Sequence, residues 1–140
     1  MFKLKNARVK SALINAGGDI YCLGDNNGKP WRVNVQDPRH PKHMLRRLKV
    51  ENRAVATSGD YEQFFDFRGR RYSHIIDPAT GYPANAGISS ATVIASNALT
   101  ADALSTSLMI LGMEKAREVL RRFPGVNAIL VDVNGRVHEF

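Results

Sequence analysis

Apolar and polar residues alternate along most of the chain, in short stretches bounded by Gly, Pro, Asn and Asp. This period of two is typical of β-strands that bury one face. Strands are predicted at residues 11–16, 19–23, 31–35, 48–57, 64–67, 71–73, 88–96, 126–133 and 136–140. We expect residues 11–16 to form a buried strand, residues 48–57 to form one bent strand, and residues 88–96 to lie centrally in the sheet.

Turn sequences predict how neighbouring strands connect. Residues 24–29 (Gly-Asp-Asn-Asn-Gly-Lys) indicate a hairpin between the second and third strands. Residues 68–70 indicate another hairpin, and Asn134 with Gly135 turns the chain into the last strand.

The pattern changes to a helical period after residue 99. Thr100 can act as N-cap, with Asp102 in the first turn, and Gly112 ends this helix. Its buried stripe is expected to be Leu104, Leu108, Met109 and Leu111. A second helix is predicted at residues 113–123, before Pro124 and Gly125. Several antiparallel strands with a helix pair predict one α+β domain over residues 1–140.

Composition and length exclude several protein classes. A chain of 140 residues with 44% hydrophobic and 24% charged residues is one ordinary globular domain. No apolar run reaches the roughly 20 residues that span a bilayer. The N-terminus lacks the apolar region of a signal peptide, so the chain as given is expected to be cytoplasmic. Cys22 is the single cysteine, which excludes an internal disulfide, and it is expected to be a small buried hydrophobe.

The net charge of +7 raises the question of a polyanionic partner. Basic residues cluster within residues 39–53 and 68–71, but no helix presents a basic face with base-reading side chains. We therefore expect solvated strand edges and loops, and no nucleic-acid partner. A basic surface also suits a polyanionic small molecule such as a dinucleotide.

Asp102 and Thr106 are four residues apart and therefore share one face of the predicted helix. A carboxylate and a hydroxyl are hard oxygen donors of the kind that Mg²⁺ accepts. The alternative is that Asp102 only complements the helix dipole while Thr106 packs in the interior. The spacing alone leaves both readings open.

His74 follows a strand and could act as a general base, as a nucleophile or as a phosphate partner. Alternatively, it could be hydrogen-bonded to the turn below it. Asp77 begins a turn sequence with Pro78 and is therefore expected to be structural. The other histidines lie in loop or terminal contexts and are expected to be solvated: His40, His43 and His138.

Two glycine-containing segments follow strands. Gly17 and Gly18 precede Asp19, and Ser58 precedes Gly59; glycine lets a backbone approach a ligand closely. The first segment is not a dinucleotide fingerprint, because no helix follows and the six-residue glycine spacing is absent. A nucleoside-contacting loop and an ordinary bulge both remain open, and Ser58 would need a nearby base to act as a nucleophile.

The order of four motifs, at residues 15–20, 56–61, 73–83 and 100–106, resembles the ApbE-type FAD:protein FMN transferases. The similarity runs from about Ser11 to the C-terminus. It implies an ApbE-like α+β fold and a Mg²⁺-dependent cleavage of the FAD pyrophosphate. In that reaction FMN is transferred to a threonine of a partner flavoprotein, and AMP leaves.

The resemblance also implies roles for individual residues. Asp102 and Thr106 match the metal ligands of the family, His74 matches the residue needed for transfer, and Ile76 matches an apolar FAD contact. Further candidates for FAD contact are Gly18, Asp19, Ser58 and Gly59.

Members of the family are considerably longer than this chain, and their N-terminal half supplies other FAD contacts and a further metal ligand. We therefore expect the N-terminal half of the fold to be missing, with a complementary fragment or a second copy as partner. An FAD pyrophosphatase that releases FMN and AMP, or a non-catalytic flavin-nucleotide binding module, are the alternative functions. Family members are often exported and anchored on the periplasmic side.

Overall fold

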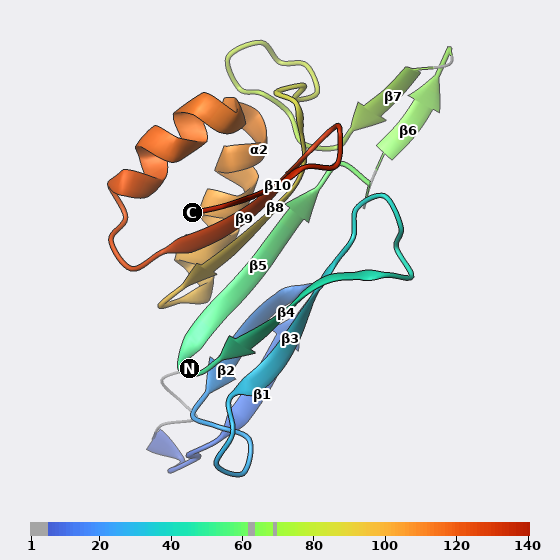
Figure 1. The fold of residues 1–140 in the computed structure, drawn as a ribbon. Coiled ribbons are helices and arrows are strands. Elements are labelled where there is room, and N and C mark those ends of the chain that lie inside the picture. The colour runs from blue at the N-terminus through green and yellow to red at the C-terminus, as the bar shows by residue number, and fades with distance from the viewer. Residues whose placement is uncertain (1–5, 62–63, 69) are drawn as a thin grey trace.

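The computed structural model describes residues 6–61, 64–68 and 70–140 (Figure 1). Within these ranges, a six-stranded antiparallel sheet has the order β1-β2-β5-β8-β9-β10. The bounds of its strands are β1 Ala12–Ala16, β2 Asp19–Leu23, β5 Arg53–Gly59, β8 Ile88–Ala95, β9 Asn127–Asp132 and β10 Val137–Glu139. The observed architecture confirms the predicted α+β class.

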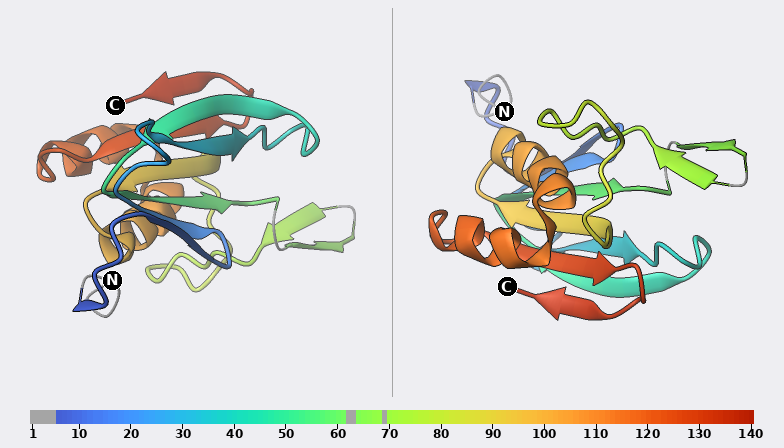
Figure 2. Two further views of the ribbon diagram at one scale, coloured as in Figure 1. Left: turned by 90° about the horizontal axis from the view of Figure 1, so that it is seen from below. Right: turned by 90° about the horizontal axis from the view of Figure 1, so that it is seen from above.

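One face of the sheet packs against α2 (Ala98–Arg121), and the other packs against the hairpin of β3 (Trp31–Gln36) and β4 (Met44–Val50), as Figure 2 shows. Alternation along β5 explains the two cores, because neighbouring side chains of a strand point to opposite faces. Ala54 and Ala56 join Leu104 of α2, whereas Val55 joins the residues of β3 and β4.

The break predicted at Gly112 is confirmed. Gly112 has φ 78° and ψ 174° inside α2, a backbone region that is open essentially to glycine alone. A Cβ at this position would lie 3.2 Å from the Ala86 carbonyl oxygen and 3.3 Å from the Ala86 Cβ. The loop that enters β8 therefore packs directly against the helix backbone where the helix breaks.

Three strand predictions need correction. β1 is an edge strand with Leu13 and Ile14 exposed, not a buried strand, because in the described sheet its only partner is β2. Residues 48–57 are not one strand, because Asn52 adopts a positive φ of 51° between β4 and β5. Residues 24–29 do not form a hairpin between β2 and β3; β3 pairs with β4 on the other layer.

The helix start also differs from the prediction. Asn97 is the N-cap, and its side-chain oxygen accepts a hydrogen bond from the Thr100 N–H at 2.9 Å. Thr100 is thus already helical, and Asp102 lies beyond the first turn, which contains no acidic residue. Asn97 is the cap because its side-chain oxygen reaches the third N–H group of the helix, which is that of Thr100 itself.

The buried stripe of α2 is confirmed for Leu104, Leu108 and Met109, whereas Leu111 is only half-buried. β6 (Phe64–Phe67) and β7 (Arg70–Ser73) pair as the predicted hairpin, with residue 69 of its turn outside the described residues, and β8 is central between β5 and β9. Cys22 is fully buried, as expected for a small hydrophobe. No helix within the described part of the chain has the length and apolar character needed to cross a membrane.

Candidate functional site

The first half of α2 runs over β5 and presents its polar face to the end of that strand. Asp102 is exposed and Thr106 is half-buried, four residues apart on the helix. Ser58, near the end of β5, points its hydroxyl at this helix rather than into solvent. The structure therefore brings Asp102, Thr106 and Ser58, which the sequence had singled out separately, into one region.

A small network of hydroxyl groups joins the strand to the helix. The Ser58 hydroxyl lies 2.8 Å from the Ser105 hydroxyl and 3.0 Å from the Thr106 hydroxyl. The Ser105 hydroxyl in turn donates to the Asp102 carbonyl oxygen at 2.9 Å. Ser105 is fully buried, and sequence reasoning missed it. The available signal was its polar side chain at a position that lies within the apolar stripe.

Asp19 belongs to the same region although it lies in β2. Burial raises the pKa of its carboxyl above the usual value of 3.8, and the negative charge of Asp102 raises that pKa further. Gly17 and Gly18 connect β1 to β2 with positive φ values of 65° and 108°. A Cβ on either glycine would meet no atom within 4 Å. The turn thus leaves open space in front of its backbone next to Asp19.

A cavity of about 540 Å³ adjoins Asp19 at the start of α2. Its lining comprises Ile14, Ala16, Asp19, Tyr21, Ser96, Asn97 and Ala98. Sequence reasoning found Asp19 but missed Tyr21 and Asn97. Tyr21 lies two residues further along β2 and therefore on the same face, which was the available signal, whereas Asn97 reaches the cavity only through the fold, as the N-cap of α2. Asp102 and Thr106 do not line this cavity.

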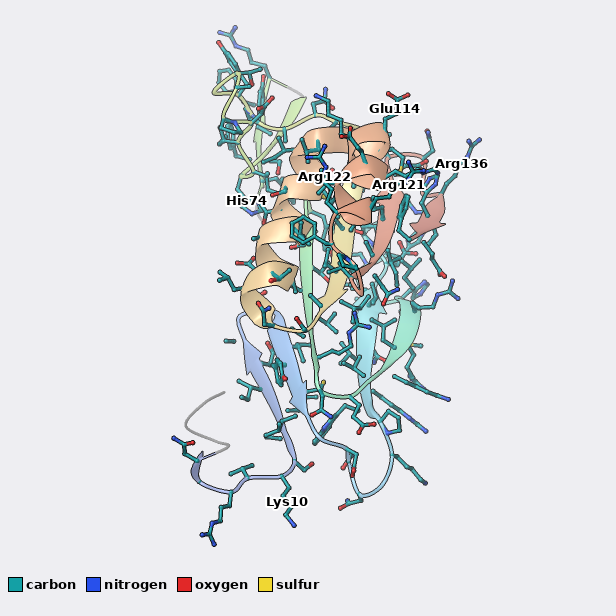
Figure 3. The ribbon with its side chains drawn as sticks, turned by 90° about the vertical axis from the view of Figure 1, so that its left-hand side faces the viewer. Lys10, His74, Glu114, Arg121, Arg122 and Arg136 are labelled. Atoms are coloured by element: carbon teal, nitrogen blue, oxygen red, sulfur yellow. The ribbon has the colours of Figure 1, made fainter. Side chains whose placement is uncertain are left out.

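His74 is exposed and follows β7 directly. The next residue, Ile75, is buried in the same core as Leu104 and Leu108 of α2, which anchors the start of the loop. Asp77 holds the following turn, since its carboxylate accepts from the Ala79 N–H at 2.9 Å. Figure 3 shows His74 on the face of the molecule that carries α2. Asp77 therefore has the structural role that its turn sequence predicts.

Ile76 and Gly59 differ in exposure. Ile76 is 48% exposed on the loop after His74, so its side chain is available to an apolar ligand. Gly59 is buried, and a Cβ there would collide with the ring of Tyr61. Close packing against Tyr61 thus accounts for glycine at this position. The FAD contacts proposed for both residues stay predictions.

His138 is half-buried rather than solvated, which corrects the expectation. Its ring Nε2 lies 3.2 Å from the Asp132 carboxylate. The Arg136 N–H donates to the same carboxylate at 2.9 Å and, together with His138, holds the pKa of Asp132 below its usual value. The pair closes the β9–β10 turn. His40 and His43 are exposed, as expected.

The side chains near Asp102 restrict which metal ion this region could bind. Among the described residues, no group of three or more His, Cys, Asp and Glu side chains is placed to hold a metal ion. The available donors are the two carboxylates of Asp19 and Asp102 and the hydroxyl of Thr106. Mg²⁺ is commonly held by one or two carboxylates together with water and substrate phosphates, so this set fits that ion and not a closed zinc site.

Replacing Asp19 by Asn is expected to stabilise the fold at neutral pH. A raised pKa in the folded state means that the ionised carboxylate costs stability, and this cost appears as the pH rises above the unfolded value of 3.8. Urea unfolding at pH 7 should show a higher free energy of unfolding for Asp19→Asn than for the wild type. At pH 3, where Asp19 is protonated in both states, the difference should disappear.

Asp37→Asn is the matched control, with the opposite sign. The Arg39 N–H donates to the Asp37 carboxylate at 2.9 Å and is the main cause of its lowered pKa. This substitution should therefore destabilise the fold at pH 7, and the loss should shrink as the pH falls below 3.8. An Asp19→Asn chain that is less stable than wild type at pH 7 would contradict the raised pKa of Asp19.

The chain is similar to known proteins of one family. The model of the ApbE family matches residues 2–130. The FAD:protein FMN transferase of Treponema pallidum (strain Nichols) is 41% identical, over 92% of this chain and 38% of the relative. That of Escherichia coli (strain K12) is 43% identical, over 81% of this chain and 33% of the relative.

Solved structures give the same result. The ApbE protein of Thermotoga maritima has a TM-score of 0.82 and 41% identity, covering 91% of this chain and 42% of its own. The flavin transferase ApbE from Vibrio cholerae has a TM-score of 0.82 and 32% identity, covering 99% of this chain and 44% of its own. The chain thus spans less than half the length of each of these four relatives.

Proposed function

This chain belongs to the ApbE family, and from that premise we propose that it carries the metal-binding and transfer residues of a Mg²⁺-dependent FAD:protein FMN transferase. The observation that carries the proposal is that Asp102 and Thr106 share one face of α2 where this helix contacts Ser58 of β5, with Asp19 near enough for the charge of Asp102 to raise its pKa. A carboxylate and a hydroxyl at this spacing are oxygen donors of the kind that Mg²⁺ accepts.

Asp102 and Thr106 would hold Mg²⁺ through a carboxylate and a hydroxyl oxygen. When bound, the ion would neutralise charge on the pyrophosphate of FAD. Gly18 leaves room for a nucleotide next to its backbone, and exposed Ile76 offers an apolar contact to the flavin. Ser58 lies behind Thr106 and would contact FAD only if its hydroxyl left the helix.

In the reaction, the hydroxyl oxygen of an acceptor threonine forms a bond to the phosphorus of the FMN half of FAD. The bond from that phosphorus to the bridging oxygen of the pyrophosphate breaks, and AMP leaves with the electron pair. His74 takes the proton of the threonine hydroxyl as a general base. Its exposure on a loop anchored by Ile75 suits a residue that must meet a protein substrate.

The substrates of the proposal are FAD and an acceptor flavoprotein. A second polypeptide is a further partner, because apolar side chains are exposed at the cavity beside Asp19 and along the edge strand β1. Ile14, which lines the cavity, is 37% exposed, Leu99 at the start of α2 is 79% exposed, and Leu13 on the other face of β1 is 40% exposed. Exposed apolar patches mark interaction surfaces. A complementary fragment, corresponding to the part of the relatives that this chain does not match, is the proposed cover, and a second copy of the chain is the alternative.

The test is an FMN-transfer assay with FAD, Mg²⁺ and a threonine-containing acceptor peptide. The chain is assayed alone and mixed with the part of the Treponema pallidum relative that it does not match. We expect covalently bound FMN on the peptide and release of AMP, with a strong increase in the mixture. Sedimentation of the same samples reports whether the mixture forms a heterodimer.

Three outcomes separate the candidate functions. Peptide-bound FMN supports transfer, whereas free FMN and AMP in equal amounts, with no modified peptide, would establish the pyrophosphatase alternative. Binding of FAD without any product in either sample would indicate that the chain is a non-catalytic flavin-nucleotide binding module. Chelation of Mg²⁺ by excess EDTA should stop product formation in the first two cases.

A further inference from the structure

In the hydrogen bonds between β5 and α2, the donor and the acceptor can be assigned by following the single hydrogen of each hydroxyl group. A carbonyl oxygen only accepts, so the Ser105 hydroxyl must use its one hydrogen to donate to the Asp102 carbonyl oxygen at 2.9 Å. In its 2.8 Å contact with Ser58, Ser105 is therefore the acceptor and Ser58 is the donor. The single hydrogen of Ser58 is thereby used.

The same reasoning fixes the hydrogen of Thr106. Because Ser58 has no second hydrogen to give, Thr106 must be the donor in their 3.0 Å contact. The order of donation is thus Thr106 to Ser58, Ser58 to Ser105, and Ser105 to the Asp102 carbonyl. The hydrogen of Thr106 points toward β5, and its lone pairs stay available on the other side of the oxygen.

We infer that Ser58 is a positioning residue for the cation site, which orients the Thr106 hydroxyl so that its lone pairs, and not its hydrogen, face the metal. This inference rests on the proposed function. A hydroxyl that binds a cation must send its hydrogen elsewhere, and groups behind metal ligands commonly supply that acceptor. Ser105 has the same role one step further back, since it keeps Ser58 in the accepting orientation toward Thr106.

The neighbouring Ser107 offers a contrast on the same helix. Its hydroxyl donates to the Ala103 carbonyl oxygen at 2.7 Å, which is the usual bond of a serine inside a helix. Without Ser58, Thr106 would be free to turn its hydrogen, and the oriented lone pairs would be lost. Ser107→Ala is therefore the matched control, because it removes a helix hydroxyl that has no link to Ser58.

The test measures Mn²⁺ binding by electron paramagnetic resonance, with FAD present, to wild type, Ser58→Ala, Ser105→Ala and Ser107→Ala. We expect the dissociation constant for Mn²⁺ to rise about tenfold or more in Ser58→Ala and in Ser105→Ala. Ser107→Ala should bind as wild type does. Circular dichroism and thermal unfolding of each variant confirm that the fold is retained.

A folded Ser58→Ala or Ser105→Ala chain that binds Mn²⁺ as tightly as wild type overturns the inference and leaves the proposed function intact. The two substitutions lie on different elements, so if one variant fails to fold, the other still tests the inference. A wild-type chain that takes up no Mn²⁺ overturns the metal site itself, and the inference with it.

Discussion

His74→Ala is expected to reduce FMN transfer by a factor of about 10² or more while the affinity for FAD changes little. The reason is that His74 is exposed on a loop and is proposed to move a proton rather than to hold the nucleotide. The rate is measured with the acceptor peptide in the complemented mixture. The dissociation constant for FAD is measured by calorimetry on the same samples.

His43→Ala serves as the control for His74, since His43 is also exposed but lies in the loop between β3 and β4. It should transfer FMN at the wild-type rate. A His74→Ala chain that keeps its rate, or that loses FAD binding together with its rate, would contradict the role of general base. The second result would assign His74 to the anchoring of the nucleotide.

Asp102→Asn is expected to weaken activation of the reaction by Mg²⁺ and to lower the transfer rate by about 10² or more, because one carboxylate ligand becomes a neutral amide. The Mg²⁺ concentration that gives half the maximal rate should rise beyond the measurable range. The pKa of Asp19 should also fall in this variant, because burial would then be the one remaining cause of its raised value.

Glu114→Gln is the matched control for Asp102→Asn. Glu114 is an exposed acid on the same helix, beyond the break at Gly112, and Figure 3 shows it at the far end from the start of α2. This variant should keep both the rate and the Mg²⁺ dependence. Equal losses in the two variants would point to the net charge of the helix instead of a metal ligand at Asp102.

The sequence predicted those features that depend on local patterns. A composition rich in Ala, Val, Ile, Thr and Ser identified β8 as a central strand, and Gly112 marked the break in the helix because of its conformational freedom. The i, i+4 spacing placed Asp102 and Thr106 on one face. These features need no knowledge of distant residues, and the structure reproduces them.

Features that depend on distant pairing could not be read from local patterns. The turn at residues 24–29 has the composition of a hairpin, but burial of Val33 in one core with Val55 takes β3 to the opposite face of the sheet. The approach of Ser58 to Ser105 joins residues 47 apart. The charge of Asp102 acts on Asp19 only because β2 pairs with β5, against which the helix packs. Tertiary contacts decide all three.

The glycine at the break of α2 has a consequence for the variation expected among homologous sequences. Position 112 is constrained twice, by its positive φ and by the backbone of Ala86 lying against it. Position 86 belongs to the segment that returns from the His74 loop to β8. A homologue with a side chain at 112 would therefore have to change the helix backbone at the break and move the loop, because the nearest atom is the carbonyl oxygen of residue 86, which any residue there would carry. Loss of this glycine is thus expected together with a change in the length or path of the segment that carries His74.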